Sequence, residues 1–160
     1  MPDVSFYTGV SVPKTETPTI DSSAASFKLA LKQSKIHRWG LFAAEPIPNK
    51  RKIIEYTGER ISRTEIKKRA GAKLNYIFTI DSYWAKDGMV GGSGAQYVNH
   101  CCEPNVQAQV RAGRIYYFAK RDIKKGEELL IDYHFDAGVE KVKCFCGAKT
   151  CRGTINDLKA

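Results

Sequence analysis

Three cysteines stand close together near the C-terminal end, in a C-x-C-x4-C run formed by Cys144, Cys146 and Cys151. Thiolates at short spacing are typical zinc ligands, and a structural zinc site is normally closed by four ligands. The other two cysteines of the chain, Cys101 and Cys102, are adjacent and lie upstream. One of these two must supply the fourth ligand. The sequence therefore predicts one zinc site that ties the C-terminal segment to residues 99–105.

Five further segments carry recognisable patterns, in the order 35–43, 55–59, 76–81, 95–105 and 126–133. They read KIHRWGLFA, EYTGE, YIFTID, AQYVNHCCEPN and GEELLIDY. In this order, and followed by the cysteine run, they resemble the motifs of the SET-domain family of protein lysine methyltransferases with a C-terminal post-SET zinc segment. Any one of them would be a weak signal, but five in family order make a specific one.

The resemblance implies a mainly β fold with short helices. In the SET fold, small curved β-sheets surround a pseudoknot, here the crossing of residues 99–100 with residues 132–133, and a zinc-stapled C-terminal segment follows. The resemblance and the composition together divide the chain into a flexible N-terminal arm (1–25), a SET domain (26–139) and a post-SET zinc-binding segment (140–160).

The hydrophobic pattern also favours a β-rich domain. Alternating or apolar runs predict strands at 27–31, 53–56, 76–80 and 129–131, and a hairpin of 106–110 with 114–119 around Ala112 and Gly113. Ser62 and Glu65 form a capping box that opens a short helix, which Gly71 would end. Four glycines predict a loop at 86–94. No glycine-rich turn joins a strand to a helix, which argues against a Rossmann-type methyltransferase.

The activity implied by the resemblance is methylation of lysine side chains of proteins with S-adenosylmethionine, histone tails being the family's commonest targets. Methyl transfer is an in-line displacement that needs positioning and a neutral amine. Free lysine has a pKa of about 10.4, and an apolar, aromatic channel disfavours its charged form. By motif position, Tyr133 is the expected catalytic tyrosine and Tyr56 the second tyrosine of the channel. Further aromatic residues near the motifs are Tyr76, Phe78, Tyr97 and Phe135, of which we expect Phe78 and Tyr97 in the core.

The resemblance also implies which residues contact the cofactor. It assigns backbone contacts to His37, Arg38 and Trp39, a polar contact to Tyr76, adenine recognition to Asn99 and His100, and a contact from the zinc segment to Phe145. For the metal it assigns Cys102, Cys144, Cys146 and Cys151. Cys101 stands where the family usually has serine, so we expect it to be an unligated thiol.

Four positions depart from the family pattern. Arg38 replaces the first glycine of the opening motif, Ser93 stands where asparagine is usual, and Gln96 replaces the arginine of A-R-F-I-N-H. These three departures bear on cofactor binding. Ile131 stands where an aromatic residue often tunes the number of methyl groups added, which leaves the degree of methylation open.

The composition fits one domain of 160 residues with a net charge of +9. Residues 1–34 carry three basic and three acidic side chains, so the excess lies in residues 35–160. Five cysteines at metal-ligand spacing, no long apolar run and no secretory signal predict an intracellular protein. It would be nuclear and chromatin-bound in a eukaryote and cytoplasmic in a bacterium.

Two other functions stay open from the sequence. The first is a non-catalytic SET-like binding module, and the second is a basic, zinc-dependent nucleic-acid-binding protein. Even a methyltransferase could contact nucleic acid through its basic surface, although charge runs more often are solvated faces.

Overall fold

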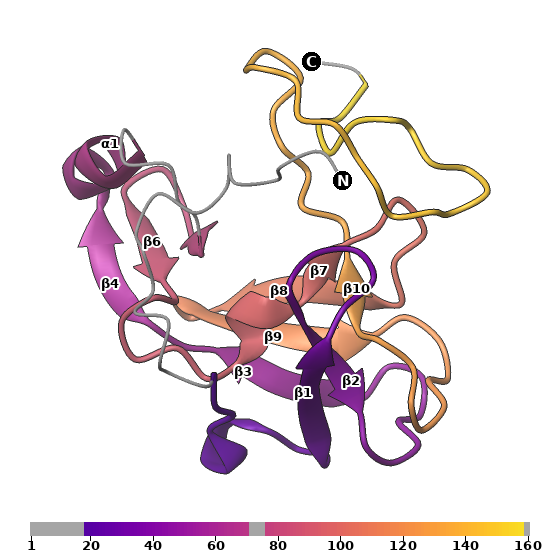
Figure 1. The fold of residues 1–160 in the computed structure, drawn as a ribbon. Helices are drawn as coiled ribbons and strands as arrows, with labels where there is room; N and C mark the ends of the chain where they lie inside the picture. The colour runs from indigo at the N-terminus through magenta and orange to yellow at the C-terminus, as the bar shows by residue number, and fades with distance from the viewer. Residues whose placement is uncertain (1–17, 71–75, 159–160) are drawn as a thin grey trace.

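The computed structural model describes residues 18–70 and 76–158 (Figure 1). Within these residues, three small β-sheets and one short α-helix form the predicted mainly β, SET-like fold. No helix in the described part of the chain is long and apolar enough to cross a membrane.

The largest sheet has five strands, in the order β3 (Lys52–Tyr56), β9 (Arg114–Ala119), β8 (Val106–Arg111), β10 (Leu130–Ile131) and β7 (Asn99–His100). Its central hairpin, β8–β9, confirms the predicted one. Ala112 and Gly113 form the turn with φ of 49° and 72°. A two-residue hairpin turn of type I′ needs positive φ at both positions, which explains the glycine at position 113.

The strands β7 and β10 bring two distant segments together. They are parallel, with Leu130 opposite Asn99 and Ile131 opposite His100. The buried amide of Asn105 closes the junction, because it donates to the Glu128 carbonyl and accepts from the Leu130 N–H, both at 2.8 Å. The two segments that we expect to cross therefore lie side by side.

A second sheet is the hairpin of β1 (Leu29–Gln33) and β2 (Trp39–Ala43). The strand predicted at 27–31 thus begins two residues later, because the Lys28 N–H bonds the Glu45 side chain at 2.8 Å and not a neighbouring strand. The hairpin's loop carries His37 and Arg38.

The third sheet consists of β4 (Glu59–Ser62), β6 (Trp84–Asp87) and β5 (Ile77–Thr79), and α1 (Arg63–Ala70) follows β4. The N-cap half of the predicted capping box is confirmed at the helix start, where the Glu65 N–H donates to the Ser62 hydroxyl at 3.3 Å, whereas the Glu65 carboxylate accepts from Arg69 Nε at 3.0 Å. The predicted stop at Gly71 lies outside the described residues. The loop predicted from residue 86 begins only at Gly88, because Lys86 and Asp87 still pair in β6.

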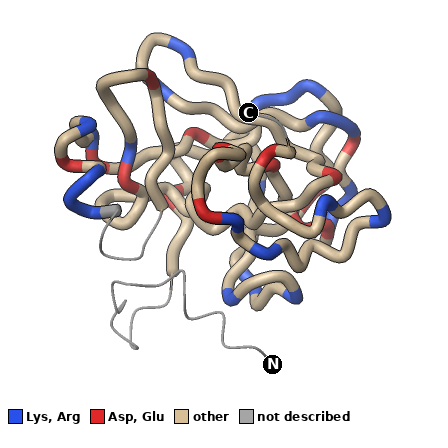
Figure 2. Tube along the Cα trace, turned by 90° about the horizontal axis from the view of Figure 1, so that it is seen from above, with Lys and Arg blue, Asp and Glu red and all other residues tan. Residues whose placement is uncertain are grey.

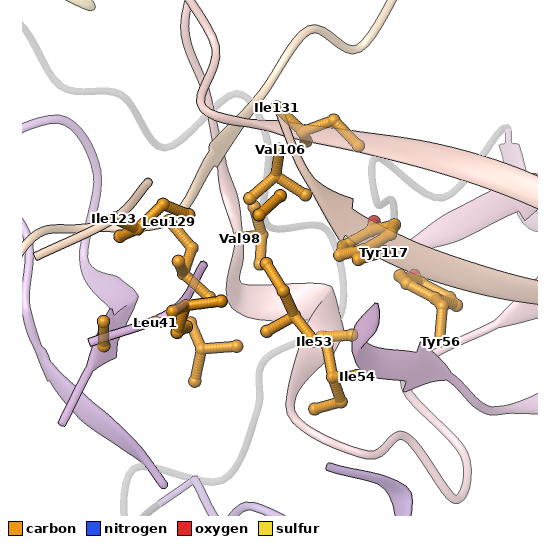
Figure 3. Close-up of a cluster of buried hydrophobic side chains, with 14 of the residues drawn as sticks. Leu41, Ile53, Ile54, Tyr56, Val98, Val106, Tyr117, Ile123, Leu129 and Ile131 are labelled. Atoms are coloured by element: carbon orange, nitrogen blue, oxygen red, sulfur yellow. The ribbon is translucent and has the colours of Figure 1, made fainter. Parts of the chain in front are cut away.

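The core lies between the β1–β2 hairpin and the five-stranded sheet (Figure 3). Its fully buried aliphatic side chains come from strands and from the turns between them: Leu41, Ile47, Ile53, Ile54, Val98, Val106, Ile115, Ile123 and Leu129. Burying each such side chain stabilises the fold by about 1.5–3 kcal/mol.

Both ends of the described chain pack on this framework. Ile20 and Ala25 contact the core, and Ala25 forms a bridge with Ile54. After β10 the chain runs to residue 158 without helix or strand and lies above β7 and β10 (Figure 1). Asn156, which is 1% exposed, holds this segment through the Val142 N–H at 2.8 Å and the carbonyls of Asp136 and Glu140 at 2.9 and 3.2 Å.

Candidate functional site

One pocket lies between the β1–β2 loop, the segment around β7 and the C-terminal segment. It contains about 920 Å³ of empty space, a figure that includes the solvent at its open mouth. All seven predicted cofactor residues and Tyr133 line it: His37, Arg38, Trp39, Tyr76, Asn99, His100, Tyr133 and Phe145. Ile36, Gln96, Tyr97, Lys143, Cys144 and Ile155 complete the wall.

The amide nitrogen of Asn99 braces the pocket from behind. It lies 3.3 and 3.0 Å from the carbonyls of His37 and Trp39, and 2.9 Å from the Glu128 carboxylate. These contacts fix the β1–β2 loop against β7. Because the nitrogen is surrounded by acceptors of the protein, the Asn99 side chain acts mainly as a brace in this structure.

His100 is 4% exposed and links the pocket to the cysteines. Its Nδ1 accepts the Tyr133 N–H at 3.1 Å, and its Nε2 lies 3.5 Å from Cys102 Sγ. A backbone N–H can only donate, so the proton of the neutral ring must sit on Nε2, facing the sulfur. Burial lowers the pKa of His100 to about 4, which keeps the ring neutral at physiological pH.

Tyr133 reaches inward from the strand end after β10. Its ring is 39% exposed, while its hydroxyl donates to the Val98 carbonyl at 2.8 Å. Burial of the hydroxyl raises its pKa. The group is therefore a protonated hydrogen-bonding group, and not a base, at neutral pH. Phe135 stacks on the Tyr133 ring at a centroid distance of 5.7 Å.

Tyr56 does not line this pocket. It is 4% exposed, its ring packs against Phe78 and Tyr117 at 5.4 and 6.0 Å, and its hydroxyl donates to the Tyr76 carbonyl. Burial raises its pKa well above the usual value. Tyr56 thus supports the pocket wall at Tyr76 from the core side.

Two expectations about aromatic residues have different outcomes. Phe78 packs against the core as expected. Tyr97 was expected there too, but it lines the pocket and contacts the Tyr76 ring edge-on at 5.6 Å. Alternation predicts a buried strand residue, whereas Tyr97 ends the short 3-10 helix η3 (Ala95–Tyr97), where the two-residue period does not apply.

The β1–β2 loop has two unusual features at the pocket. Arg38 is exposed and has φ of 35°, in the left-handed region that non-glycine residues rarely adopt. The Nε2 atom of His37 is buried and has no hydrogen-bond partner among the described residues. Burial and the charge of Arg38 lower the pKa of His37. An unpaired buried nitrogen in a pocket wall fits a site that takes a polar ligand.

The predicted cysteines gather beside the pocket. The Sγ atoms of Cys102, Cys144, Cys146 and Cys151 all lie within 4.8 Å of one another. Zn–S bonds of about 2.3 Å in a tetrahedron put sulfur atoms roughly 3.8 Å apart, and the Cys102 and Cys144 sulfurs are 3.8 Å apart. This donor set could hold a zinc ion. Cys101 lies outside it, and burial raises the pKa of its thiol to about 11.

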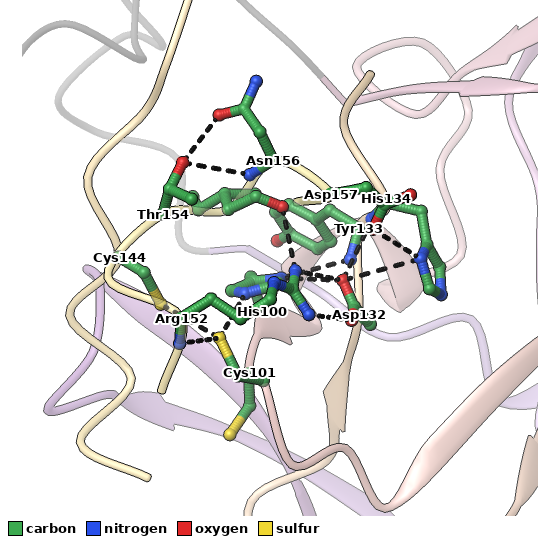
Figure 4. A network of polar contacts seen from close by, with 12 residues as sticks. His100, Cys101, Asp132, Tyr133, His134, Cys144, Arg152, Thr154, Asn156 and Asp157 are labelled. Atoms are coloured by element: carbon green, nitrogen blue, oxygen red, sulfur yellow. Dashed lines mark hydrogen bonds and ion pairs between the residues drawn. The ribbon is translucent and has the colours of Figure 1, made fainter. Parts of the chain in front are cut away.

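Arg152 joins the cysteine cluster to the strand end that carries Tyr133 (Figure 4). Its backbone N–H lies 3.4 Å from Cys102 Sγ, and its guanidinium contacts the Asp132 carboxylate at 2.6 and 3.0 Å. The sequence did not predict this pair, because no pattern marks a contact between two loop residues. Asp132, His134 and Asp157 form a second group of metal-ligand type, but Asp132 already pairs with Arg152.

Positive charge is spread over the surface. Lysine and arginine occupy separate loops around the molecule, with acidic residues between them (Figure 2). Arg69, Arg114 and Arg121 pair with nearby carboxylates. The helix of the described chain, α1, has eight residues. The described part of the chain thus offers no long recognition helix of the kind that enters a DNA groove.

Comparison with protein families identifies a match to the SET domain over residues 38–134. The histone-lysine N-methyltransferase set-2 of Caenorhabditis elegans is 40% identical over 134 residues, which cover 78% of this chain and 9% of that protein. The H3 lysine-4 specific histone-lysine N-methyltransferase of Saccharomyces cerevisiae is 39% identical over 137 residues, covering 78% of this chain and 13% of that protein.

A solved structure is similar as well. A chain of a humanized mutant of the Chaetomium thermophilum Polycomb Repressive Complex 2, bound to the inhibitor GSK126, superposes with a TM-score of 0.63 and 33% identity. The match covers 68% of this chain and 15% of that one. This chain spans only 9–14% of the length of the curated relatives that it matches.

Proposed function

This chain belongs to the SET-domain family, and we propose that it is an S-adenosylmethionine-dependent methyltransferase of protein lysine side chains. The observation that carries the proposal is the single pocket shared by Tyr133, the His37–Arg38–Trp39 loop and the Asn99–His100 strand. The names of the relatives, histone-lysine N-methyltransferases, support a histone tail as the substrate. They are much longer proteins, so their substrate comes to this chain only as part of the proposal.

The chemistry of the pocket wall fits the cofactor. Its wall combines the rings of Trp39, Tyr76 and Phe145 with the unpaired Nε2 of His37. We assign the cofactor to these residues, together with Arg38, Asn99 and His100. Bound S-adenosylmethionine supplies a methyl group on a sulfonium sulfur, which makes the carbon electrophilic. The buried contacts of Asn99 would keep the loop and β7 at a fixed separation around it.

The lysine must enter as a neutral amine. Among the described residues, the pocket lining includes no aspartate or glutamate that could act as a general base. Aromatic walls disfavour the ammonium form. We assign the hydroxyl of Tyr133 to positioning: it donates to the Val98 carbonyl and keeps lone pairs that can accept a hydrogen bond from the amine. Tyr56 would support the channel from the core side through the Tyr76 carbonyl.

Zinc bound by Cys102, Cys144, Cys146 and Cys151 would hold one wall of the pocket. Lys143, Cys144 and Phe145 line the pocket, and two of the four proposed ligands lie within or next to this run. In the C-terminal segment the described chain forms no helix or strand after β10. A metal would therefore supply much of its order, and ordering of this segment would be coupled to completion of the pocket.

A histone substrate would place the protein at nuclear chromatin. Nucleic acid next to the substrate could then contact exposed basic side chains, such as Lys50, Arg51, Lys124 and Lys125. We regard this contact as secondary, because the charge is dispersed and several arginines pair with carboxylates.

Transfer of label from radioactive S-adenosylmethionine to purified histones or cell extract tests the proposal. We expect a labelled protein band with the zinc-loaded protein and none with Tyr133→Phe. The non-catalytic module would be favoured if the protein bound S-adenosylmethionine but labelled no protein in any extract. A nucleic-acid-binding protein would show a steep loss of nucleic-acid binding with salt and no affinity for the cofactor.

A further inference from the structure

Arg38 holds an unfavourable backbone conformation at the mouth of the pocket. Its φ of 35° lies in the left-handed region, which glycine enters without cost and which costs other residues about 1–3 kcal/mol. The family pattern has glycine here. An arginine at a strained position beside a ligand pocket points to a use for its side chain.

The Arg38 guanidinium is available for a ligand. It is exposed, and among the described residues it has no ion pair, hydrogen bond or aromatic ring beneath it. The other cation of the pocket wall, Lys143, lies over the Phe145 ring at 5.1 Å. The described residues that line the pocket include no carboxylate side chain. The wall is thus positively charged, and Arg38 is its unpartnered cation.

The second departure from the family pattern lies on the same pocket. Gln96 stands where the motif has arginine, and its Oε1 accepts the Gly94 N–H at 2.8 Å. A neutral side chain with a local hydrogen bond replaces a cation at position 96. A cation replaces glycine at position 38. Both residues line one pocket, so, relative to the family motif, the pair of substitutions moves a positive charge from one lining position to another.

We propose that Arg38 binds the carboxylate of the methionine part of S-adenosylmethionine and so replaces the cation missing at position 96. This inference rests on the proposed function. The carboxylate is the only anionic group of that cofactor, and the planar fork of a guanidinium matches its two oxygens. Arg38 thereby contacts the cofactor through its side chain as well as its backbone. The side-chain contact makes it a specificity-determining residue, because it favours cofactors that carry an amino-acid carboxylate.

Calorimetric binding to the zinc-loaded protein tests the inference without requiring turnover. The probes are S-adenosylmethionine and its decarboxylated form, which keeps the sulfonium and the amine. For Arg38→Gly we expect the affinity for S-adenosylmethionine to fall roughly ten- to a hundredfold. The affinity for the decarboxylated form should stay within about twofold of wild type, since it lacks the group that Arg38 recognises.

Two further variants sharpen the result. Arg38→Gly combined with Gln96→Arg should recover most of the lost affinity, because it restores the arrangement of the family. Lys35→Gln, an exposed cation of the same loop that does not line the pocket, should bind both probes like wild type. Thermal unfolding of each variant confirms that it is folded.

The outcomes separate the two proposals. If wild-type protein binds neither probe, the proposed function and this inference both fall. If S-adenosylmethionine binds wild type and Arg38→Gly equally, or if the variant loses both probes equally, the role of the Arg38 side chain is refuted while the proposed function stands.

Discussion

Arg152 and Asp132 form a two-point ion pair, with Nη1–Oδ2 and Nη2–Oδ1 distances of 2.6 and 3.0 Å. Asp132 directly precedes Tyr133, and Arg152 directly follows Cys151. The pair therefore connects the peptide of the proposed catalytic tyrosine to that of a proposed zinc ligand. Both side chains are largely buried, at 18% and 10% exposure.

Loss of the Arg152 guanidinium should be strongly destabilising. Arg152→Met leaves the Asp132 carboxylate buried without its counter-charge, which typically costs about 3–5 kcal/mol. Urea unfolding of the zinc-loaded protein measures this cost. The control is Arg121→Met, which removes a more exposed pair with Glu127 (54% and 29% exposed) and should change stability by about 1 kcal/mol or less. Equal, small effects of both variants would show that the buried pair does not hold the two segments together.

The cysteine cluster predicts a defined metal stoichiometry. Purified protein should contain one zinc per chain by elemental analysis, and Cys151→Ser should lose most of it, because three thiolates leave a structural site incomplete. Cys101→Ser is the matched control, since Cys101 lies outside the cluster, and should keep the metal. Full zinc content in Cys151→Ser, or its loss in Cys101→Ser, would mean that the ligand set is wrong.

Strain at Arg38 should be visible in stability. Arg38→Gly relieves a positive φ that costs a non-glycine residue about 1–3 kcal/mol, partly offset by the flexibility that glycine adds to the unfolded chain. The variant should therefore unfold at a higher temperature than wild type in the absence of ligand. Arg38→Ala removes the same charge but keeps the Cβ, so it should show no such gain. A gain with alanine as large as with glycine would argue against backbone strain.

Tyr56 should be less important than Tyr133 for methyl transfer. Tyr56→Phe removes the hydrogen bond to the Tyr76 carbonyl, at a cost in stability of about 0.5–1.5 kcal/mol, since this carbonyl still accepts the Gly88 N–H at 2.7 Å. Its effect on the rate should be smaller than that of Tyr133→Phe, because Tyr56 lies behind the pocket wall. Comparing kcat and KM for the two variants checks this order. A larger loss of kcat in Tyr56→Phe would place its hydroxyl at the reacting atoms.

Local signals in the sequence predicted local structure well. The hairpin around Ala112 and Gly113, the helix start at Ser62 and the spacing of the three C-terminal cysteines are each encoded within a few residues. The choice of Cys102 over Cys101 came from the family motif, since spacing alone fits either.

The remaining features depend on contacts between distant residues. The strands β7 and β10 have two residues each, too few to show a period, and they exist only because they pair with each other. The same holds for Arg152 and Asp132, which are both in loops. Motif position says where Tyr56 lies along the chain, but not to which side of the sheet its ring points, so its place behind the pocket wall could not be predicted.

The most direct test of methyltransferase activity is mass spectrometry of purified histones after incubation with the zinc-loaded protein and S-adenosylmethionine. We expect methyl groups on lysine side chains with wild type, and none above background with Tyr133→Phe, although that variant should still bind the cofactor by calorimetry. Unmodified histones with cofactor-bound wild type would contradict a histone substrate, and equal methylation by Tyr133→Phe would contradict the assignment of the site.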